Sequence, residues 1–257
     1  MIKRVLIVVG ALLGAVIASA VLLFASAFIG TSDVKDGAVF ADGKVVTVLD
    51  GFVAAYLVDV GGGKWAVVDA GNDPQGGAIK AALAARGAQT ADLVAILLTH
   101  GHGDHVAGAK AFPGVRTYAL AAELPLIVGE VAARSPMGTV RGAVDTGVRI
   151  SEPLTDGQVI RVGDTDFEVL AVSGHTAGST AYLVHGVLLV GDSVRATPEG
   201  ELMAAPWLFS DDGAQNVASL AALASRLAPR KHSITALLPA HTGALSGLQP
   251  LLDFAAQ

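Results

Sequence analysis

The sequence contains no cysteine in its 257 residues. Disulfide bonds and thiolate metal sites are therefore excluded, so any bound cation must be held by histidine, carboxylate or other oxygen ligands. The missing thiols do not decide the cellular compartment, but they are compatible with an oxidising one, where a stray thiol would be a liability.

Aromatic and charged residues are also scarce, at 5% and 16% of the chain, and the formal net charge is -6. The sequence shows no cluster of lysine and arginine, which a nucleic-acid binder needs to contact phosphates. We therefore expect a small-molecule partner and no nucleic acid. Hydrophobic residues make up 52% of the chain, which favours a tightly packed domain of mixed helices and strands.

The first 30 residues differ in composition from the rest. Lys3 and Arg4 precede an uncharged run that extends to residue 30, and its core, residues 5–24, is long enough to span the ~30 Å hydrocarbon layer of a bilayer. This run predicts a transmembrane anchor, although the small residues 25–27 also allow a cleaved signal peptide, and a buried core helix is a third interpretation. In the first two cases the rest of the protein lies outside the cytoplasm, anchored or secreted.

Residues 31–37 are expected to form a short polar linker, and residues 38–257 a single domain of α+β class. Short runs rich in valine, leucine and isoleucine alternate there with turn signals. Strands are expected at residues 44–49, 52–60, 64–69, 93–99, 115–118, 159–162, 167–172, 180–184, 187–190 and 234–238. Helices are expected at 77–86, 106–112, 121–133, 214–227 and 244–255, with a loop at 135–148. This order predicts two mixed sheets packed together with helices outside.

Four potential metal ligands follow the predicted strand 93–99 in quick succession: His100, His102, Asp104 and His105. Two intervening glycines let the chain fold back, so that side chains from one short stretch can converge. Imidazole and carboxylate groups suit Zn²⁺ and related divalent ions. One tetrahedral ion cannot use all four and still leave room for water and more distant ligands, so the cluster favours two ions.

Three later residues share this setting, because each follows a predicted strand in a glycine-containing turn: His175, Asp192 and His241. Any one of them alone is weak evidence, since histidine and aspartate are common in turns. Together with the cluster they predict one metal centre built on strand ends. We expect His185 and His232 at the surface, and Tyr182 and Trp207 in the core rather than lining a substrate cleft. Residues 210–213 are expected to cap the helix that follows.

The order His-x-His-x-Asp-His, followed by a lone His, a lone Asp and a last His, resembles the metallo-β-lactamase-fold superfamily. Residues 67–71 also resemble the first motif of that family, in which an aspartate, here Asp69, ends a strand and orients the site from behind. The resemblance runs from about residue 40 to the C-terminus and implies a four-layer αββα sandwich. It implies one metal held by His100, His102 and His175, a second held by Asp104, His105 and His241, and Asp192 as a bridge between them.

The resemblance further implies a hydrolase that acts on a small molecule with two divalent ions, of which Zn²⁺ is expected and Mn or Fe is compatible. Two ions roughly 3.5–4 Å apart would activate a bound hydroxide, which attacks an ester, thioester, lactone or amide-type bond. Asp104 is placed to orient this nucleophile and to pass a proton to the leaving group. The family chemistry then needs no serine or cysteine nucleophile.

Some members of the superfamily are disfavoured. The lack of cysteine excludes β-lactamases that use a thiolate, whereas thiol-free β-lactamases stay open and would suit an exported location. The diiron oxygen reductases have Glu where His102 stands. A bridging Asp192 is more typical of relatives similar to glyoxalase II or lactonases, although the chain ends too soon after His241 for the helical extension of glyoxalase II. Two other classes stay open: an iron-dependent oxidoreductase similar to the persulfide dioxygenases, and a non-enzymatic membrane-tethered binding protein.

Overall fold

The computed structural model describes residues 14, 18–19, 21–23 and 25–257. The chain divides into two compact units, Met1–Gly30 and Thr31–Gln257. The predicted spanning run, residues 5–24, lies mostly outside the described residues, and among those that are described no helix combines the length and apolarity needed to cross a bilayer. The predicted linker, residues 31–37, belongs to the second unit, where the backbone N–H of Ser32 donates to the carbonyl of Ala196 at 2.9 Å.

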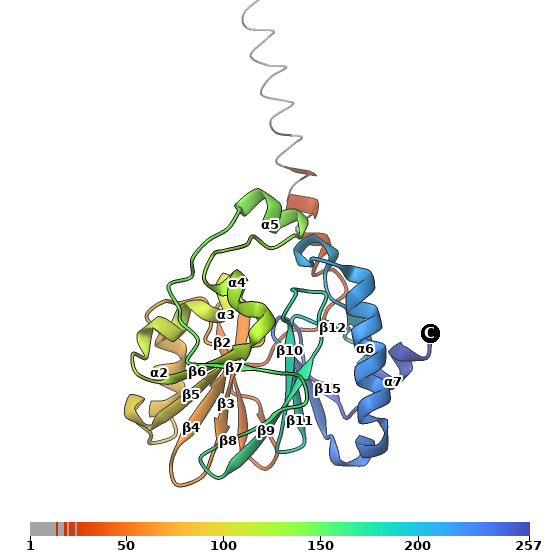
Figure 1. The fold of residues 1–257 in the computed structure, drawn as a ribbon. Helices are drawn as coiled ribbons and strands as arrows, with labels where there is room; N and C mark the ends of the chain where they lie inside the picture. Colours follow the sequence, from red (N-terminus) through yellow and green to blue (C-terminus); the bar gives the residue numbers. More distant parts are fainter. Residues whose placement is uncertain (1–13, 15–17, 20, 24) are drawn as a thin grey trace, which may run out of the picture. The chain divides into compact units, whose positions relative to one another are not determined.

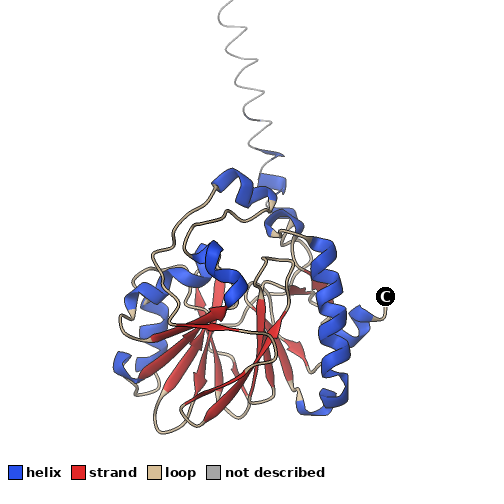
Figure 2. Cartoon of the chain, viewed as in Figure 1, coloured by secondary structure: helices blue, strands red, loops and turns tan. Residues whose placement is uncertain are grey.

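The second unit contains two large mixed sheets (Figures 1 and 2). The first has seven strands in sequence order, antiparallel from β1 to β4 and parallel from β4 to β7. Its strands are β1 (Val39–Phe40), β2 (Val45–Asp50), β3 (Val53–Asp59), β4 (Trp65–Val68), β5 (Leu93–Leu97), β6 (Arg116–Leu120) and β7 (Glu152–Leu154). The second has six strands in the order β15-β14-β11-β10-β9-β8, in which only the β11–β14 pair is parallel. These strands are β8 (Val159–Val162), β9 (Thr165–Ala171), β10 (Thr180–Val184), β11 (Val187–Gly191), β14 (Ala236–Pro239) and β15 (Leu245–Ser246).

A short hairpin and the helices complete the unit. The hairpin pairs β12 (Val194–Ala196) with β13 (Leu202–Ala204). The α-helices are α2 (Gly77–Ala84), α3 (Gly103–Val106), α4 (Leu124–Ile127), α5 (Pro136–Arg141), α6 (Gly213–Leu227) and α7 (Gln249–Ala255). The 3₁₀ turns are η1 (Thr90–Asp92), η2 (Ala107–Ala111), η3 (Ala121–Glu123), η4 (Trp207–Phe209) and η5 (Ala228–Ser233).

Three apolar cores show how these layers stack. The central core lies between the sheets and contains residues of both, such as Tyr56 of β3 and Phe167 of β9. A second core joins the first sheet to α2 through Ile79 and Leu83. The third joins the other sheet to α6 and α7, with Leu220 of α6 fully buried. The layers are therefore helix, sheet, sheet and helix, as the resemblance implies.

Two buried tyrosines link the sheets by hydrogen bonds. The hydroxyl of Tyr56, on the first sheet, donates to the carbonyl of Pro239 at 2.6 Å, and that of Tyr182, on the second, donates to the carbonyl of Leu98 at 2.8 Å. Both acceptors lie just before candidate metal ligands. Because an unpaired buried carbonyl is costly, these bonds hold the strand ends of the two sheets at a fixed separation.

Most predicted strands are present, but several helices were misplaced. The helix predicted at residues 106–112 is instead α3 followed by η2, and the one predicted at 121–133 ends at Ile127. The expected loop 135–148 contains α5, whose first turn is capped by the Ser135 hydroxyl accepting from the Gly138 N–H. The final helix begins only at Gln249, because β15 occupies the start of the predicted range.

Candidate metal centre

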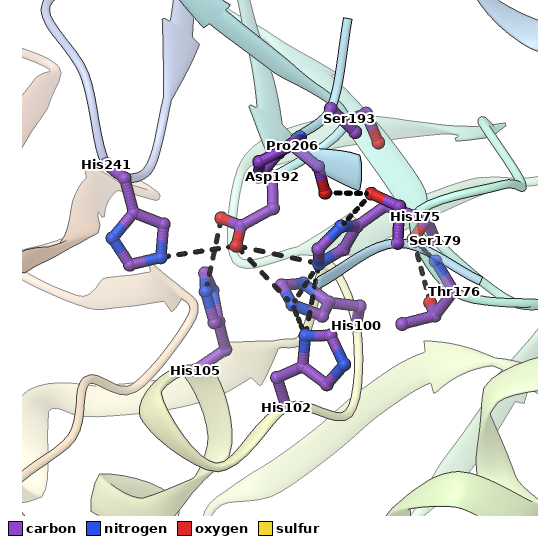
Figure 3. Close-up of polar contacts among 12 residues, drawn as sticks. His100, His102, His105, His175, Thr176, Ser179, Asp192, Ser193, Pro206 and His241 are labelled. Atoms are coloured by element: carbon purple, nitrogen blue, oxygen red, sulfur yellow. Dashed lines mark hydrogen bonds and ion pairs between the residues drawn. The ribbon is translucent and has the colours of Figure 1, made fainter. Parts of the chain in front are cut away.

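The seven predicted ligands come together at one end of the two sheets, and Figure 3 shows six of them, all except Asp104. The first four follow β5 and lead into α3, while the others follow β9, β11 and β14. A left-handed turn at Gly191, with φ of 54°, brings Asp192 to this end. A side chain at Gly191 would collide with Thr99, so only glycine allows this close approach. The side chains form two groups that could each hold an ion: His100, His102, His175 and Asp192, and Asp104, His105 and His241.

In the first cluster, the nitrogens of three histidines lie within 3.2 Å of one another. The Nε2 atom of His100 lies 3.0 Å from Nδ1 of His102 and 3.2 Å from Nε2 of His175, and His102 Nδ1 lies 3.1 Å from His175 Nε2. A tetrahedral ion with Zn–N bonds of about 2.0–2.1 Å separates its ligand nitrogens by about 3.3 Å. The three nitrogens are therefore spaced as the ligands of one small ion would be.

The second cluster shares a carboxylate with the first. His241 Nε2 lies 3.3 Å from Oδ2 of Asp104 and 3.2 Å from Oδ2 of Asp192. The other Asp192 oxygen, Oδ1, is 3.2 Å from His105 Nε2. Oδ2 also lies 3.5 Å from His175 Nε2 in the first cluster. Asp192 is thus the residue that faces both groups.

Hydrogen bonds behind the first cluster decide which ring nitrogens carry protons. The Thr99 hydroxyl donates to Asp69 at 2.8 Å, so it accepts from Nδ1 of His100 at 3.1 Å. In the same way, the Ser210 hydroxyl donates to the Pro206 carbonyl and accepts from Nδ1 of His175 at 3.1 Å. A neutral imidazole has one N–H, so the two Nε2 atoms face each other as lone pairs. Two lone pairs at 3.2 Å cannot hydrogen-bond, and a cation between them resolves this conflict.

The second cluster is built in the same way. Nδ1 of His105 donates to the Asp69 carboxylate at 2.8 Å, and Nδ1 of His241 donates to the Phe52 carbonyl at 2.9 Å. The Nε2 atoms of both rings again point inward. Nε2 of His105 and Oδ1 of Asp192 are buried 3.2 Å apart, and neither has another hydrogen-bond partner in the described part of the chain. A proton on His105 Nε2, or an ion bound between the two atoms, would satisfy both.

Burial and neighbouring charges separate the two clusters electrostatically. Burial, together with the adjacent His102, lowers the pKa of His175 to about 3, and burial likewise lowers the pKa of His100. Burial opposes the charging of His241 too, but Asp192 and Asp104 outweigh it and raise the pKa of His241 to about 10. For His105, Asp192, Asp69 and Asp104 overcome burial and raise the pKa well above its usual value. Either protons or a cation must therefore balance the charge of the second cluster.

Asp104 is the most accessible acid of the centre, with a side chain 23% exposed. Burial alone would raise its pKa, but His105 and a hydrogen bond from His241 lower it to about 2. This side chain is consequently ionised at neutral pH. Phe52, which is 60% exposed, stacks on His241 with ring centroids 5.7 Å apart, and so forms an apolar wall beside the open side of the centre.

Asp69 lies behind the centre, as the family motif implies. Its carboxylate accepts from the backbone N–H and the hydroxyl of Thr99 and from Nδ1 of His105. Its backbone has φ of 59°, a left-handed conformation that is uncommon for a residue other than glycine. The three hydrogen bonds hold this conformation in place and fix the orientation of the His105 ring.

Sequence reasoning missed several residues that hold the ligands. Glu123 was placed only in a helix, yet it is fully buried and contacts the loops of the first cluster. Ser210 was assigned to a helix cap, whereas it fixes His175. The cap itself is confirmed, because Asp212 accepts from the Gln215 N–H. No spacing rule marks Glu123, since its burial depends on loops distant in sequence.

The burial of the aromatic residues and histidines that were not predicted as ligands agrees only partly with the sequence prediction. Tyr182 is buried as predicted, but Trp207 is 56% exposed, so the assignment of Trp207 to the core was wrong. His232 is exposed as predicted, while His185 is half-buried and its Nε2 lies 3.0 Å from the Asp59 carbonyl. His185 is held by a hairpin turn, and neither histidine takes part in the two clusters.

Comparisons with known proteins identify relatives of this chain. A family model described as the metallo-beta-lactamase superfamily matches residues 48–241. A hydroxyacylglutathione hydrolase of Cereibacter sphaeroides is 37% identical over 154 residues, which cover 58% of this chain and 50% of that protein. One of Halorhodospira halophila is 34% identical over 105 residues, covering 40% and 34% of the two chains. The chain thus spans half or less of the length of these curated relatives.

Solved structures share the fold. BJP-1, a subclass B3 metallo-beta-lactamase of Bradyrhizobium japonicum, superimposes with a TM-score of 0.62 at 20% identity, over 83% of this chain and 87% of that one. A protein crystallised in a di-iron-bound form gives a TM-score of 0.58 at 24% identity, over 80% and 95% of the two chains. Identities this low establish the fold alone.

The pKa pattern predicts that metal binding releases protons. At pH 7 the raised pKa values keep His105 and His241 protonated in the metal-free protein, and a cation at the second cluster must displace both protons. The first cluster is already neutral, so it releases none. We expect about two protons per fully loaded centre, with affinity rising as the pH rises from 7 toward the His241 pKa of about 10. Isothermal titration with Zn²⁺ in buffers of different ionisation enthalpy measures this number, and full loading without proton release would contradict the assignment.

Proposed function

Because this chain belongs to the metallo-beta-lactamase superfamily, we propose that it is a metal-dependent hydrolase that cleaves an acyl bond of a small molecule. One observation carries the proposal: ring nitrogens of histidines point inward in two adjacent clusters that share one carboxylate, Asp192. His100, His102 and His175 would hold one ion, Asp104, His105 and His241 the other. The name of the relatives, hydroxyacylglutathione hydrolase, favours a thioester as the substrate class. Zn²⁺ suits the nitrogen-rich ligand set, and iron is compatible with it.

Two bound cations would lower the pKa of a water shared between them and polarise the acyl carbonyl. The chain supplies the remaining functions. Asp104, ionised and partly open to solvent, is positioned to orient that water and to carry a proton to the leaving group. Asp192 holds the two clusters in fixed relation, and Phe52 limits the access of bulk water on the His241 side.

Activity should depend on the cluster residues. We expect a thioester panel to show turnover with the full chain in mild detergent, with a kcat/KM loss of about 10²-fold or more in His102→Ala and in Asp104→Asn. His232→Ala, an exposed histidine outside both clusters, is the matched control. Hydrolysis that survives both substitutions would contradict the mechanism.

The same panel separates the competing functions. Besides thioesters, the panel contains ester, lactone and β-lactam substrates, and a separate assay measures oxygen consumption with a persulfide substrate. Oxygen consumption with bound iron would favour a persulfide dioxygenase-like oxidoreductase. Bound metal without turnover of any substrate would favour a membrane-tethered binding protein.

One cationic side chain beside the centre, Arg141, would suit an anionic substrate. The exposed guanidinium of Arg141, at the end of α5, lies beside Gly103 between two proposed ligands: a Cβ built on Gly103 would be 3.4 Å from its Nη2. Nearby surface on α5 and η4 is apolar and open, with Val140 82% and Trp207 56% exposed. Asp211 ties this region to the centre by accepting from the N–H of Ser135 while its own N–H donates to the His175 carbonyl.

Arg141→Gln should therefore raise KM for a carboxylate-bearing thioester about 5-fold, corresponding to about 1 kcal/mol for an exposed charge contact. KM for a neutral thioester of similar size should not change, because the lost contact is electrostatic. Arg161→Gln, an exposed arginine of β8, serves as the control. Equal effects of Arg141→Gln on both substrates would exclude an anion contact there.

We also propose that residues 5–24 anchor the domain outside the cytoplasm, which the uncharged run after Lys3 and Arg4 supports. The full chain should then sediment with membranes and resist carbonate extraction, and protease added to the outer face should digest the domain. Recovery of the full chain in the cytosolic fraction would rule the anchor out.

A further inference from the structure

Glu123 is a buried acid to which the proposed reaction assigns no role. It ends η3, and its side chain has no exposed surface. Its Oε1 accepts from the Gly101 N–H at 2.7 Å, while Oε2 accepts from the Thr176 hydroxyl at 2.9 Å and from the Gly178 N–H at 2.7 Å. Every hydrogen bond to this carboxylate thus comes from a loop that carries proposed ligands.

The three donors lie in two loops, one from each sheet. Gly101 separates His100 from His102 in the loop after β5, whereas Thr176 and Gly178 follow His175 in the loop after β9. All three histidines of the first cluster are therefore in segments hydrogen-bonded to one side chain. The donors come from residues 22, 53 and 55 positions away in sequence, so the carboxylate joins segments that the chain does not hold together locally.

The backbones of both loops pack closely against the Glu123 side chain. A Cβ on Gly178 would collide with the Glu123 backbone nitrogen and with Oε2, and one on Gly101 would lie 3.2 Å from Oε1 and 2.9 Å from Ile127. Ser179 supports the same contact from the second loop, because its hydroxyl is 2.7 Å from that of Thr176, which donates to Glu123. The two glycines let both backbones approach the carboxylate.

Asp69 has the corresponding position behind the second cluster. Its carboxylate accepts hydrogen bonds from the ring of His105 and from Thr99, and within the described residues none comes from the loop of His175. Two buried carboxylates thus support the centre differently: Glu123 holds the loops of the first cluster, whereas Asp69 binds His105 of the second directly and reaches His100 of the first only through the Thr99 hydroxyl.

We propose that Glu123 is a positioning residue that holds His100, His102 and His175 in ligand geometry, and so sets the affinity of the first ion but not of the second. This inference rests on the proposed metal centre and not on any particular substrate. Residues that orient ligands from behind change metal affinity by about 10- to 100-fold when they are mutated. Glu123→Gln is the sharpest change, because its amide keeps one acceptor oxygen and turns an N–H₂ group toward a donor.

The test measures Zn²⁺ affinity in full-length protein reduced to one cluster at a time. His241→Ala leaves the first cluster, and His102→Ala leaves the second. Glu123→Gln should weaken Zn²⁺ binding about 10- to 100-fold in the His241→Ala background and by less than about 3-fold in the His102→Ala background. Asp69→Asn should weaken the second cluster more than the first. Glu130→Gln, an exposed glutamate just beyond α4, is the matched control and should change neither.

Two further measurements keep the result interpretable. Thermal unfolding of the metal-free variants shows whether Glu123→Gln is folded. If it is not, Thr176→Val, which removes one donor and preserves shape, should weaken the first cluster selectively by a smaller factor. Equal loss at both clusters, or no loss at the first, would overturn the proposal. Selective loss in a protein that hydrolyses nothing would uphold it while refuting the proposed function.

Discussion

Each of four histidines in this centre gives its Nδ1 proton to an acceptor that belongs to the protein scaffold, and the rest of the site depends on that constraint. The acceptors are the Thr99 and Ser210 hydroxyls, the Asp69 carboxylate and the Phe52 carbonyl. Because each ring is held by its outer nitrogen, the inner nitrogen is oriented toward the cluster. In His100 and His175 the inner nitrogen carries a lone pair, whereas in the metal-free His105 and His241 the raised pKa keeps a proton on it. Lone pairs crowded into a buried space repel one another, and only a proton or a cation relieves the repulsion.

The two large sheets keep the ligand side chains close together despite this repulsion. The strand ends that carry the ligands are fixed by the apolar core between the sheets and by the Tyr56 and Tyr182 hydroxyls, which pair with carbonyls next to the ligand loops. Interiors packed at this density do not relax easily, so the repulsion within the clusters cannot be dissipated by small shifts of the backbone. The packing of the whole unit therefore keeps the ligand nitrogens at the spacing that an ion needs.

The sequence predicts the fold and the ligand cluster well because both depend on local pattern. Runs such as 93–97 are apolar and short, and the histidines follow directly in a glycine-containing turn, so strand and site are visible together. The helix predicted at 106–112 was misplaced because this segment forms a 3₁₀ turn after the single turn of α3. The helix predicted at 121–133 is divided into η3 and the short α4, which has Pro125 in its first turn. Glu123 could not be predicted, since an acid in a helical segment is ordinarily solvated, and its burial arises only when two distant loops close over it. Trp207 was misassigned for the opposite reason, because its exposure follows from its place on a surface turn.

The division of the ligands between the sheets also bears on how the centre arises during folding. His100 and His175 are 75 positions apart in sequence yet their ring nitrogens are 3.2 Å apart. Neither sheet alone carries a complete cluster, so an ion can bind fully only after the two sheets have docked. This docking joins residues that are far apart in sequence, and such contacts form slowly during folding. An ion in the surroundings would then stabilise the folded protein after the sheets have docked, and it would not nucleate folding.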